Sequence, residues 1–192
     1  HDVVAKLRGI LHIKKIGHTG TLDPDAVGVL PVCIGKGTKL CDMITDTDKT
    51  YEAVMLLGIS TDTQDISGNV LSKKDVAVDE KTLIETVDSF VGEYKQIPPM
   101  YSAIKVNGRK LYQLAREGIE IERSPRDVYI RSIHINDMNL QDGEPSVTMT
   151  VSCSKGTYIR TLCHDIGEKL GCGACMKSLS RTRVGRFYID DS

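Results

Sequence analysis

Strict alternation of apolar and polar residues in two stretches is the feature that most limits how this chain can fold. In residues 146–153 every second side chain is apolar, and residues 129–136 alternate in a similar way. The apolar face of the first stretch consists of Val147, Met149, Val151 and Cys153. Because successive side chains of a strand point to opposite faces, both stretches are predicted to be half-buried strands. Residues 49–57 alternate poorly, which is typical of a strand covered on both faces.

Other stretches carry apolar residues at helical spacing. Such stripes are found in residues 1–11, 80–91 and 158–170, which predicts three amphipathic helices. Shorter elements are also expected, namely helices at 37–45 and 109–117 and strands at 29–34, 69–71 and 184–189. Strands and helices do not alternate regularly along the chain. The predicted class is therefore α/β of the α+β type, with a mixed, mainly antiparallel sheet flanked by helices.

Residues 17–28, with the sequence GHTGTLDPDAVG, are expected to form a rigid loop. Proline disfavours helical backbone in the residue before it, so Pro24 should hold Asp23 in an extended conformation. A single carboxylate fixed in this way suits an active site. The same pattern also fits a helix N-cap, with Asp23 accepting backbone hydrogen bonds and Pro24 at the first helical position. Both interpretations can hold at once.

Charge is unevenly distributed, although the formal net charge is only −1. Residues 154–186 contain seven basic and two acidic residues, and residues 101–131 contain seven basic and four acidic ones. Tyrosines lie within both segments, at Tyr101, Tyr112, Tyr129 and Tyr158. The two segments are candidates for a phosphate-binding face, and a solvated surface of mixed charge explains the composition equally well.

The sequence lacks several signals that would define other classes of protein. No apolar run reaches the ~20 residues of a membrane span and no secretory signal is visible, so a cytoplasmic protein with reduced cysteines is expected. Cys172-Gly-Ala-Cys175, with Cys163-His164 upstream, fits a zinc site, but one C-x-x-C pair is a weak signal. Motifs of nucleotide-binding loops, zinc enzymes and serine hydrolases are missing. The remaining candidates for a functional role are a lone aspartate, several tyrosines and a basic face.

Gly17-His-Thr-Gly-Thr-Leu-Asp-Pro24 resembles the catalytic motif of the TruB family, the tRNA pseudouridine-55 synthases. The resemblance continues, in family order, through residues 48–51 (DKTY), 58–65 (GISTDTQD), 96–105 (QIPPMYSAIK), 107–112 (NGRKLY), 115–118 (AREG), 153–160 (CSKGTYIR) and 170–174 (LGCGA). It implies a pseudouridine synthase fold for residues 1–192, with residues 98–118 as an RNA-gripping insertion. The family's opening Lys-Pro-x-Gly segment and its small C-terminal RNA-binding domain are not matched, which puts full tRNA affinity in doubt.

The resemblance also implies roles for individual residues. Asp23 matches the catalytic aspartate. The substrate-binding residues that it implies are His18, which holds the flipped nucleotide, Tyr51, which stacks on the target base, and Tyr158, Arg160 and Leu179, which line the uridine pocket. Asp65 is expected to pair with Arg160. Contacts to the RNA backbone are expected from Lys105, Arg109, Lys110 and Arg116.

The implied activity is isomerisation of uridine to pseudouridine at position 55 in the T-loop of tRNA, without a metal or an organic cofactor. The nucleotide would be flipped into a pocket, where Asp23 attacks C1′ or acts as a base toward C2′. The expected partner is the T-arm of tRNA, with no guide RNA, no obligate protein partner and no membrane. Two alternatives are a guide-RNA-dependent, dyskerin-type relative and a non-catalytic RNA-binding module. The intact segment 105–112 favours the stand-alone enzyme over the former, and the intact Asp23 loop disfavours the latter.

Overall fold

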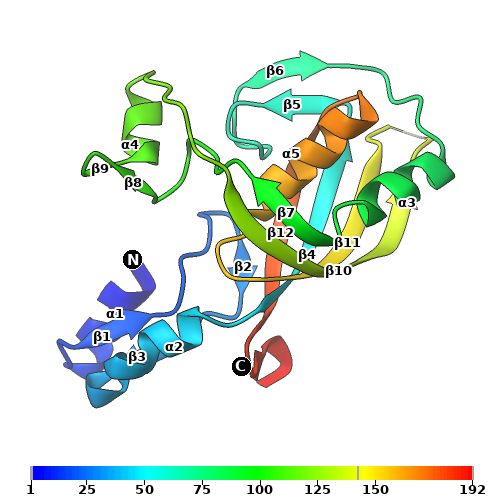
Figure 1. Ribbon diagram of the computed structural model, residues 1–192. Coiled ribbons are helices and arrows are strands. Elements are labelled where there is room, and N and C mark those ends of the chain that lie inside the picture. Colours follow the sequence, from blue (N-terminus) through cyan, green and yellow to red (C-terminus); the bar gives the residue numbers. More distant parts are fainter. Residues whose placement is uncertain (1, 142, 192) are drawn as a thin grey trace.

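A seven-stranded sheet forms the centre of the computed structural model, which describes residues 2–141 and 143–191 (Figure 1). Its strands, in spatial order, are β13 (Phe187–Tyr188), β12 (Ala174–Val184), β4 (Lys49–Leu57), β11 (Ser146–Cys153), β10 (Arg126–Asn139) and β7 (Gly92–Gln96). Neighbours on this path pair antiparallel, while β2 (Val27–Gly28) pairs parallel with β12. The expected mixed, mainly antiparallel sheet is therefore confirmed.

Two helices cover one face of this sheet and enclose the main core. They are α5 (Ile159–Leu170) and α3 (Glu80–Asp88), and their buried residues join one apolar cluster with those of β4 and β11. The alternating side chains of β11 supply four members of this cluster, Val147, Met149, Val151 and Cys153. At the end of α5, Gly171 adopts the left-handed conformation with φ 80°, which is favourable for glycine. The alternation and the helical stripe thus predicted this layer correctly.

The N-terminal elements lie together at one end of the molecule (Figure 1). Helix α1 (Asp2–Leu11) confirms the first expected helix, of which His1 lies outside the described residues. Strand β1 (Ile16–His18) pairs antiparallel with β3 (Val32–Ile34), which is shorter than the strand expected at 29–34. The helix expected at 37–45 is a 3-10 helix, η1 (Gly35–Leu40), followed by the short α2 (Cys41–Thr45).

The expected insertion at residues 98–118 projects from the sheet as a separate lobe (Figure 1). It contains a small hairpin, β8 (Lys105–Val106) and β9 (Arg109–Lys110), and the helix α4 (Leu111–Arg116). Met100, Leu111 and Leu114 form an apolar cluster of their own, apart from the main core. The helix expected from residue 109 therefore starts two residues later, because the first two residues pair in the hairpin.

The C-terminal part of the sheet differs from the prediction. The strand expected at 184–189 is confirmed only in part, because β12 ends at Val184 and the chain turns before the short β13 and a 3-10 helix, η2 (Ile189–Asp191). Strand β12 itself was missed because register shifts between Met176 and Ser178 and between Arg181 and Arg183 break its alternation. Beside the sheet, β5 (Ile59–Thr61) and β6 (Val70–Lys73) form a hairpin, which includes the strand expected near 69–71. Within the described ranges, no helix is long and apolar enough to cross a membrane.

Candidate active site

The loop that carries Asp23 runs from the end of β1 to β2 and lies against the strand β12. Pro24 and Asp25 form a turn, and the amide of Ala26 donates to the carbonyl of Asp23 at 3.1 Å. The alternative of a helix N-cap at Asp23 is therefore wrong. The chain cannot continue as a helix because Val27 and Gly28 pair with Ser180 and Arg181 of β12 immediately after the turn.

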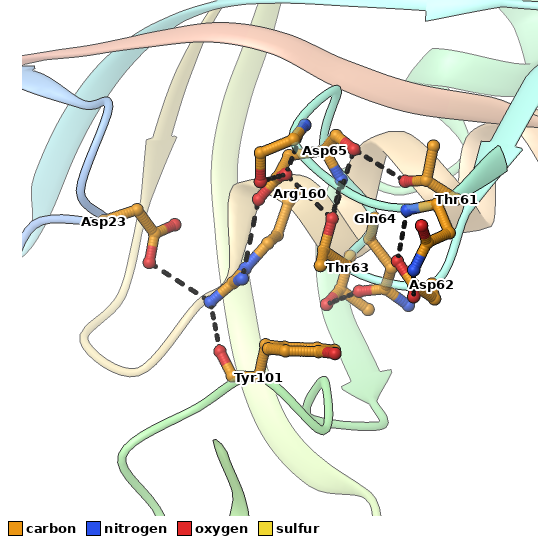
Figure 2. A network of polar contacts seen from close by, with 11 residues as sticks. Asp23, Thr61, Asp62, Thr63, Gln64, Asp65, Tyr101 and Arg160 are labelled. Atoms are coloured by element: carbon orange, nitrogen blue, oxygen red, sulfur yellow. Dashed lines mark hydrogen bonds and ion pairs between the residues drawn. The ribbon is translucent and has the colours of Figure 1, made fainter. Parts of the chain in front are cut away.

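Arg160, the second residue of α5, connects three separate segments of the chain (Figure 2). Its Nη2 donates to Oδ1 of Asp23 at 3.1 Å and to the carbonyl oxygen of Tyr101 at 2.7 Å. Its Nη1 lies 3.7 Å from Oδ2 of Asp65, which confirms the expected pairing of these two residues. The Arg160 side chain is only 6% exposed, whereas 32% of the Asp23 side chain remains accessible. One guanidinium thus holds a carboxylate that is still open to an incoming molecule.

Opposing effects act on the ionisation of Asp23. Burial raises the pKa of its carboxyl above the usual value, and the positive charge of Arg160 lowers it again. The carboxylates of Asp65 and Asp25 add a smaller upward effect. The net result is a raised pKa, so that this group holds its proton more tightly than an exposed aspartate does.

Asp65 is held in place by a tight turn between β5 and β6. Its Oδ1 accepts hydrogen bonds from Oγ1 of Thr63 at 2.8 Å and from the amide of Ser67 at 3.0 Å. The preceding Gln64 has a positive φ of 66°, and its Oε1 accepts from Oγ1 of Thr161 at 2.7 Å. This bond ties the turn to the first turn of α5, next to Arg160 (Figure 2). Asp65 therefore orients Arg160 from the side opposite Asp23.

Tyr51 and Leu179 lie on the neighbouring strands β4 and β12, where both belong to the main core cluster and each is 8% exposed. Burial raises the pKa of the Tyr51 hydroxyl to about 12, and the negative charge of Asp23 contributes to this rise. The hydroxyl is therefore protonated at neutral pH. Tyr51 and the Asp23 loop are linked through β12, because Arg181 of that strand pairs with Tyr51 and with Gly28.

Backbone contacts position Tyr158 beside Arg160 and His18 at the start of the Asp23 loop. Tyr158 precedes α5, where its amide donates to Oε1 of Gln96 at 2.8 Å and its carbonyl accepts from Nε2 of Gln96 at 2.9 Å. The Tyr158 ring centroid lies 5.9 Å from the guanidinium carbon of Arg160. His18 ends β1, and its Nδ1 accepts a hydrogen bond from the amide of Gly20 at 3.3 Å. This bond fixes the ring at the start of the Asp23 loop.

The four basic residues expected to contact RNA are gathered around α4 in the projecting lobe. Lys110 and Arg116 both lie over the ring of Tyr112, each 5.4 Å from its centroid. Arg109 forms an ion pair with Glu117, while Lys105 is exposed on the neighbouring hairpin strand. The carbonyl of Tyr101, which accepts from Arg160, lies at the base of this lobe. The lobe is therefore tied directly to the residue that holds Asp23.

Sequence reasoning missed two residues that shape the site, Arg181 and Gln96. Both side chains are fully buried, at 1% exposure each, and both bind backbone groups of residues beside the site. Their residue types did not indicate burial, because arginine and glutamine are usually exposed. Only the tertiary structure shows that these two side chains are covered. The proline-interrupted stretch that begins with Gln96 did mark an irregular segment, but not the partner of that side chain.

The cysteines do not form a metal centre in the described part of the chain. Cys163, Cys172 and Cys175 are all buried, and no group of three or more potential ligands is close enough to hold a metal ion among the described residues. Burial raises the pKa of the Cys175 thiol to about 11. The zinc alternative therefore has no support from the arrangement of the described residues.

Comparison with known proteins places the chain in a family. The family profile described as "TruB family pseudouridylate synthase (N terminal domain)" matches residues 8–159, and "tRNA pseudouridylate synthase B C-terminal domain" matches residues 160–192. A chain in a crystal structure of a Cbf5–Nop10–Gar1 complex superimposes with a TM-score of 0.72 at 34% identity, over 98% of this chain and 46% of that one. The expected pseudouridine synthase fold is thereby confirmed.

Curated relatives have the same family name. A tRNA pseudouridine synthase B of Lachnoclostridium phytofermentans is 60% identical over 100% of this chain, and one of Alkaliphilus oremlandii is 54% identical over 99% of it. The chain spans 64% and 62% of the lengths of these two relatives. Because the first profile covers more than half of the residues and these identities extend along the whole sequence, the chain belongs to the TruB family of pseudouridylate synthases.

Proposed function

We propose that this chain isomerises uridine to pseudouridine at position 55 in the T-loop of tRNA, with Asp23 as the catalytic residue. The observation that carries the proposal is the partly open Asp23 carboxylate, held by Arg160 at 3.1 Å in a loop that resembles the family's catalytic motif. Family membership and relatives named tRNA pseudouridine synthase B support the same reaction and the same class of RNA.

A single carboxylate is enough for this chemistry. The N1–C1′ bond of the nucleotide breaks, the base turns, and a C5–C1′ bond forms, while C5 loses a proton and N1 gains one. The product is an isomer, so no electrons are gained or lost and no water is consumed. An ionised Asp23 performs the first step either by attacking C1′ or by taking a proton from C2′. Arg160 supports both routes because its charge favours the ionised carboxylate.

We assign the residues around Asp23 to the wall of the pocket that would receive the flipped base. We assign the stacking surface to the ring of Tyr51, since a base on an aromatic side chain gains about 1–3 kcal/mol. Tyr158 and Leu179 complete the wall, and Asp65 keeps Arg160 in position. His18, fixed at the start of the loop, is assigned the role of holding the displaced nucleotide.

The projecting lobe is the proposed grip on the T-arm. Its cations suit contacts to phosphates, which dominate the affinity for nucleic acids; Lys105, Arg109 and Arg116 are exposed and Lys110 is half-buried. The lobe has its own apolar cluster, and the carbonyl of Tyr101 in the lobe accepts a hydrogen bond from Arg160. RNA bound to the lobe would therefore be held in a defined position relative to Asp23. The expected substrate is tRNA alone, although the likeness to a chain in a Cbf5 complex keeps a guided reaction as the second candidate.

The test is a conversion assay on an unmodified tRNA transcript with no guide RNA, with pseudouridine mapped to the nucleotide. The protein should convert the uridine at position 55, and Asp23→Asn should abolish product while tRNA affinity stays within about threefold. Asp25→Asn is the matched control, because Asp25 lies exposed in the same turn. Conversion only after a guide RNA is added would favour the dyskerin-type alternative. Full turnover by Asp23→Asn would refute the assignment of Asp23.

A further inference from the structure

Arg181 is a charged residue in an unusual position. It is the largest fully buried side chain of the described residues, with 1% exposure, in the middle of the missed strand β12. None of the ion pairs found within residues 2–141 and 143–191 involves it. A buried charge without an opposite charge is costly unless hydrogen bonds compensate for the lost water. The groups that accept its hydrogen bonds therefore indicate what the residue does.

These acceptors lie at the two ends of the Asp23 loop. Nε of Arg181 donates to the carbonyl of Val29 at 2.8 Å, and Nη2 donates to the carbonyl of Gly20 at 3.2 Å. The Arg181 carbonyl accepts the amide of Val29 at 2.8 Å. A single residue thus binds the chain on both sides of Asp23 and fixes the two ends of the loop.

Two glycines allow the loop to lie this close to Arg181. Gly28 has φ 110°, and a Cβ atom at this position would lie 2.2 Å from the Arg181 carbonyl oxygen. Gly20 has φ 129°, and a Cβ atom there would lie 3.7 Å from Nη1 of Arg181. Both glycines therefore adopt backbone angles that side chains disfavour, and at Gly28 the contact itself excludes a side chain.

Arg181 also contacts the proposed stacking residue. It lies directly opposite Tyr51 in the pairing of β12 with β4. Its positive charge opposes the rise in the pKa of Tyr51 that burial causes. The residue that binds both ends of the Asp23 loop is thus also the cross-strand neighbour of Tyr51.

We propose that Arg181 is a positioning residue that sets the distance and orientation between the Asp23 carboxylate and the ring of Tyr51. The proposal rests on the proposed function, because these two groups must meet the ribose and the base of one nucleotide. Arg181 itself is fully buried and is assigned no contact with the nucleotide. Its planar guanidinium group can reach two carbonyls at once, which the single ammonium group of a lysine cannot do in the same geometry.

The first test does not depend on activity. Amide hydrogen exchange is measured for the full chain carrying Arg181→Met or Arg181→Lys, with Arg183→Met as the matched control on the same strand. Arg183 donates to Gly185 at 2.6 Å and lies over the ring of Tyr188, away from the loop. Arg181→Met should speed exchange of the amides between Gly20 and Val29 by more than tenfold, with β11 unchanged, and Arg181→Lys should give a smaller increase. Unchanged loop exchange in both Arg181 variants would overturn the proposal.

The second test uses single-turnover conversion of tRNA together with binding. Arg181→Met should lower the rate about 100-fold while tRNA affinity changes less than threefold, and Arg181→Lys should recover part of the rate. If Arg181 acts partly through the Tyr51 hydroxyl, Tyr51→Phe combined with Arg181→Met should lose less than the product of the two single effects. Rates for Arg181→Met within threefold of the unaltered protein, or fully multiplicative losses, would contradict the proposal. If the unaltered protein converts no tRNA, the proposed function fails, and the exchange experiment still decides whether Arg181 holds the loop.

Discussion

Nη2 of Arg160 lies 3.1 Å from Oδ1 of Asp23, a contact between residues 137 positions apart in the sequence. The arginine is buried and further fixed by Asp65 and by the carbonyl of Tyr101, whereas the aspartate remains partly accessible. This asymmetry gives the two residues different roles. Arg160 belongs to the rigid frame, and Asp23 is the group that can meet a substrate.

The ionisation of Asp23 leads to a prediction for the pH dependence of the reaction. Its pKa lies above the usual 3.8, so single-turnover rates should fall on the acid side at a higher pH than for an exposed aspartate. Arg160→Met removes the charge that lowers this pKa, so the rate of this variant should begin to fall at a still higher pH. The turnover of the variant should drop more than its affinity for tRNA. Arg131→Met, which breaks a surface pair with Asp48, is the control and should keep the limb in place. If the rates of Arg160→Met and Arg131→Met fell at the same acid pH, this account would be contradicted.

The same raised pKa predicts that Asp23→Asn stabilises the protein. A carboxyl whose pKa is higher in the folded state binds its proton more tightly there, so its ionisation costs stability as the pH rises through that pKa. Asparagine cannot ionise, and Arg160 keeps Asp65 and the Tyr101 carbonyl as partners. Thermal unfolding of Asp23→Asn at pH 7 should therefore occur at a higher temperature than that of the unaltered protein. In a domain of this size, each kcal/mol gained in the free energy of unfolding raises the unfolding temperature by about 2–4 °C. The gain should shrink toward acid pH, and a lower unfolding temperature at pH 7 would disagree with the prediction.

Gly28→Ala should destabilise the fold, because the new methyl group would lie 2.2 Å from the Arg181 carbonyl oxygen and φ is 110° there. Left-handed strain and overpacking each cost roughly 1–3 kcal/mol. Gly37→Ala is the matched control, since no atom lies within 4 Å of a Cβ added at that position. Urea unfolding of both variants measures the difference. Equal stabilities would show that the loop shifts away from β12 at little cost.

Salt dependence should identify the cations that contact RNA. Lys110→Ala and Arg116→Ala should each reduce the slope of log affinity against log salt, by up to about 0.9 for a lost phosphate contact on a duplex. Arg109→Ala should have a smaller effect, because Arg109 already pairs with Glu117. Lys81→Ala, a change on the exposed face of α3, should leave the slope unaltered. An unchanged slope for both lobe variants would remove the lobe from the RNA interface.

Chelation provides a direct check on the cysteines. Because no group of three or more possible metal ligands is found among the described residues, treatment with a strong chelator should change neither the unfolding temperature nor the rate. The matched control is a zinc-dependent enzyme treated in parallel. A loss of structure on chelation would restore the zinc alternative for Cys172 and Cys175.

The sequence predicted those parts of the fold in which local pattern and burial agree. Strand β11 and helix α5 each have one clearly apolar face, and both were identified from spacing alone. Strand β12 was not, because its two register shifts and its run of serines and arginines hide the pattern. Only the pairing with β4 shows that Arg181 faces inward. The spacing of residues within one segment does not predict its pairing with a distant strand.

The candidate site shows the same division. The resemblance to a family motif singled out Asp23, Arg160 and Asp65, which the structure brings into contact, and Pro24 correctly marked a turn. The N-cap interpretation of Asp23 was wrong because a tertiary contact, the pairing of β2 with β12, takes the place of a helix. Gln96 was missed for a similar reason. The side-chain amide of Gln96 is buried and binds the backbone N–H and C=O of Tyr158. These contacts depend on the tertiary fold, and no sequence pattern predicts them.

The bond between Arg181 and Val29 joins residues 152 positions apart, and this has a consequence for biosynthesis. The Asp23 loop is synthesised before β12, and neither its parallel pairing nor its buried arginine partner exists until β12 has been synthesised. A nascent chain therefore carries Asp23 without these contacts until that point. The order of synthesis thus delays assembly of the candidate site until β12 has emerged.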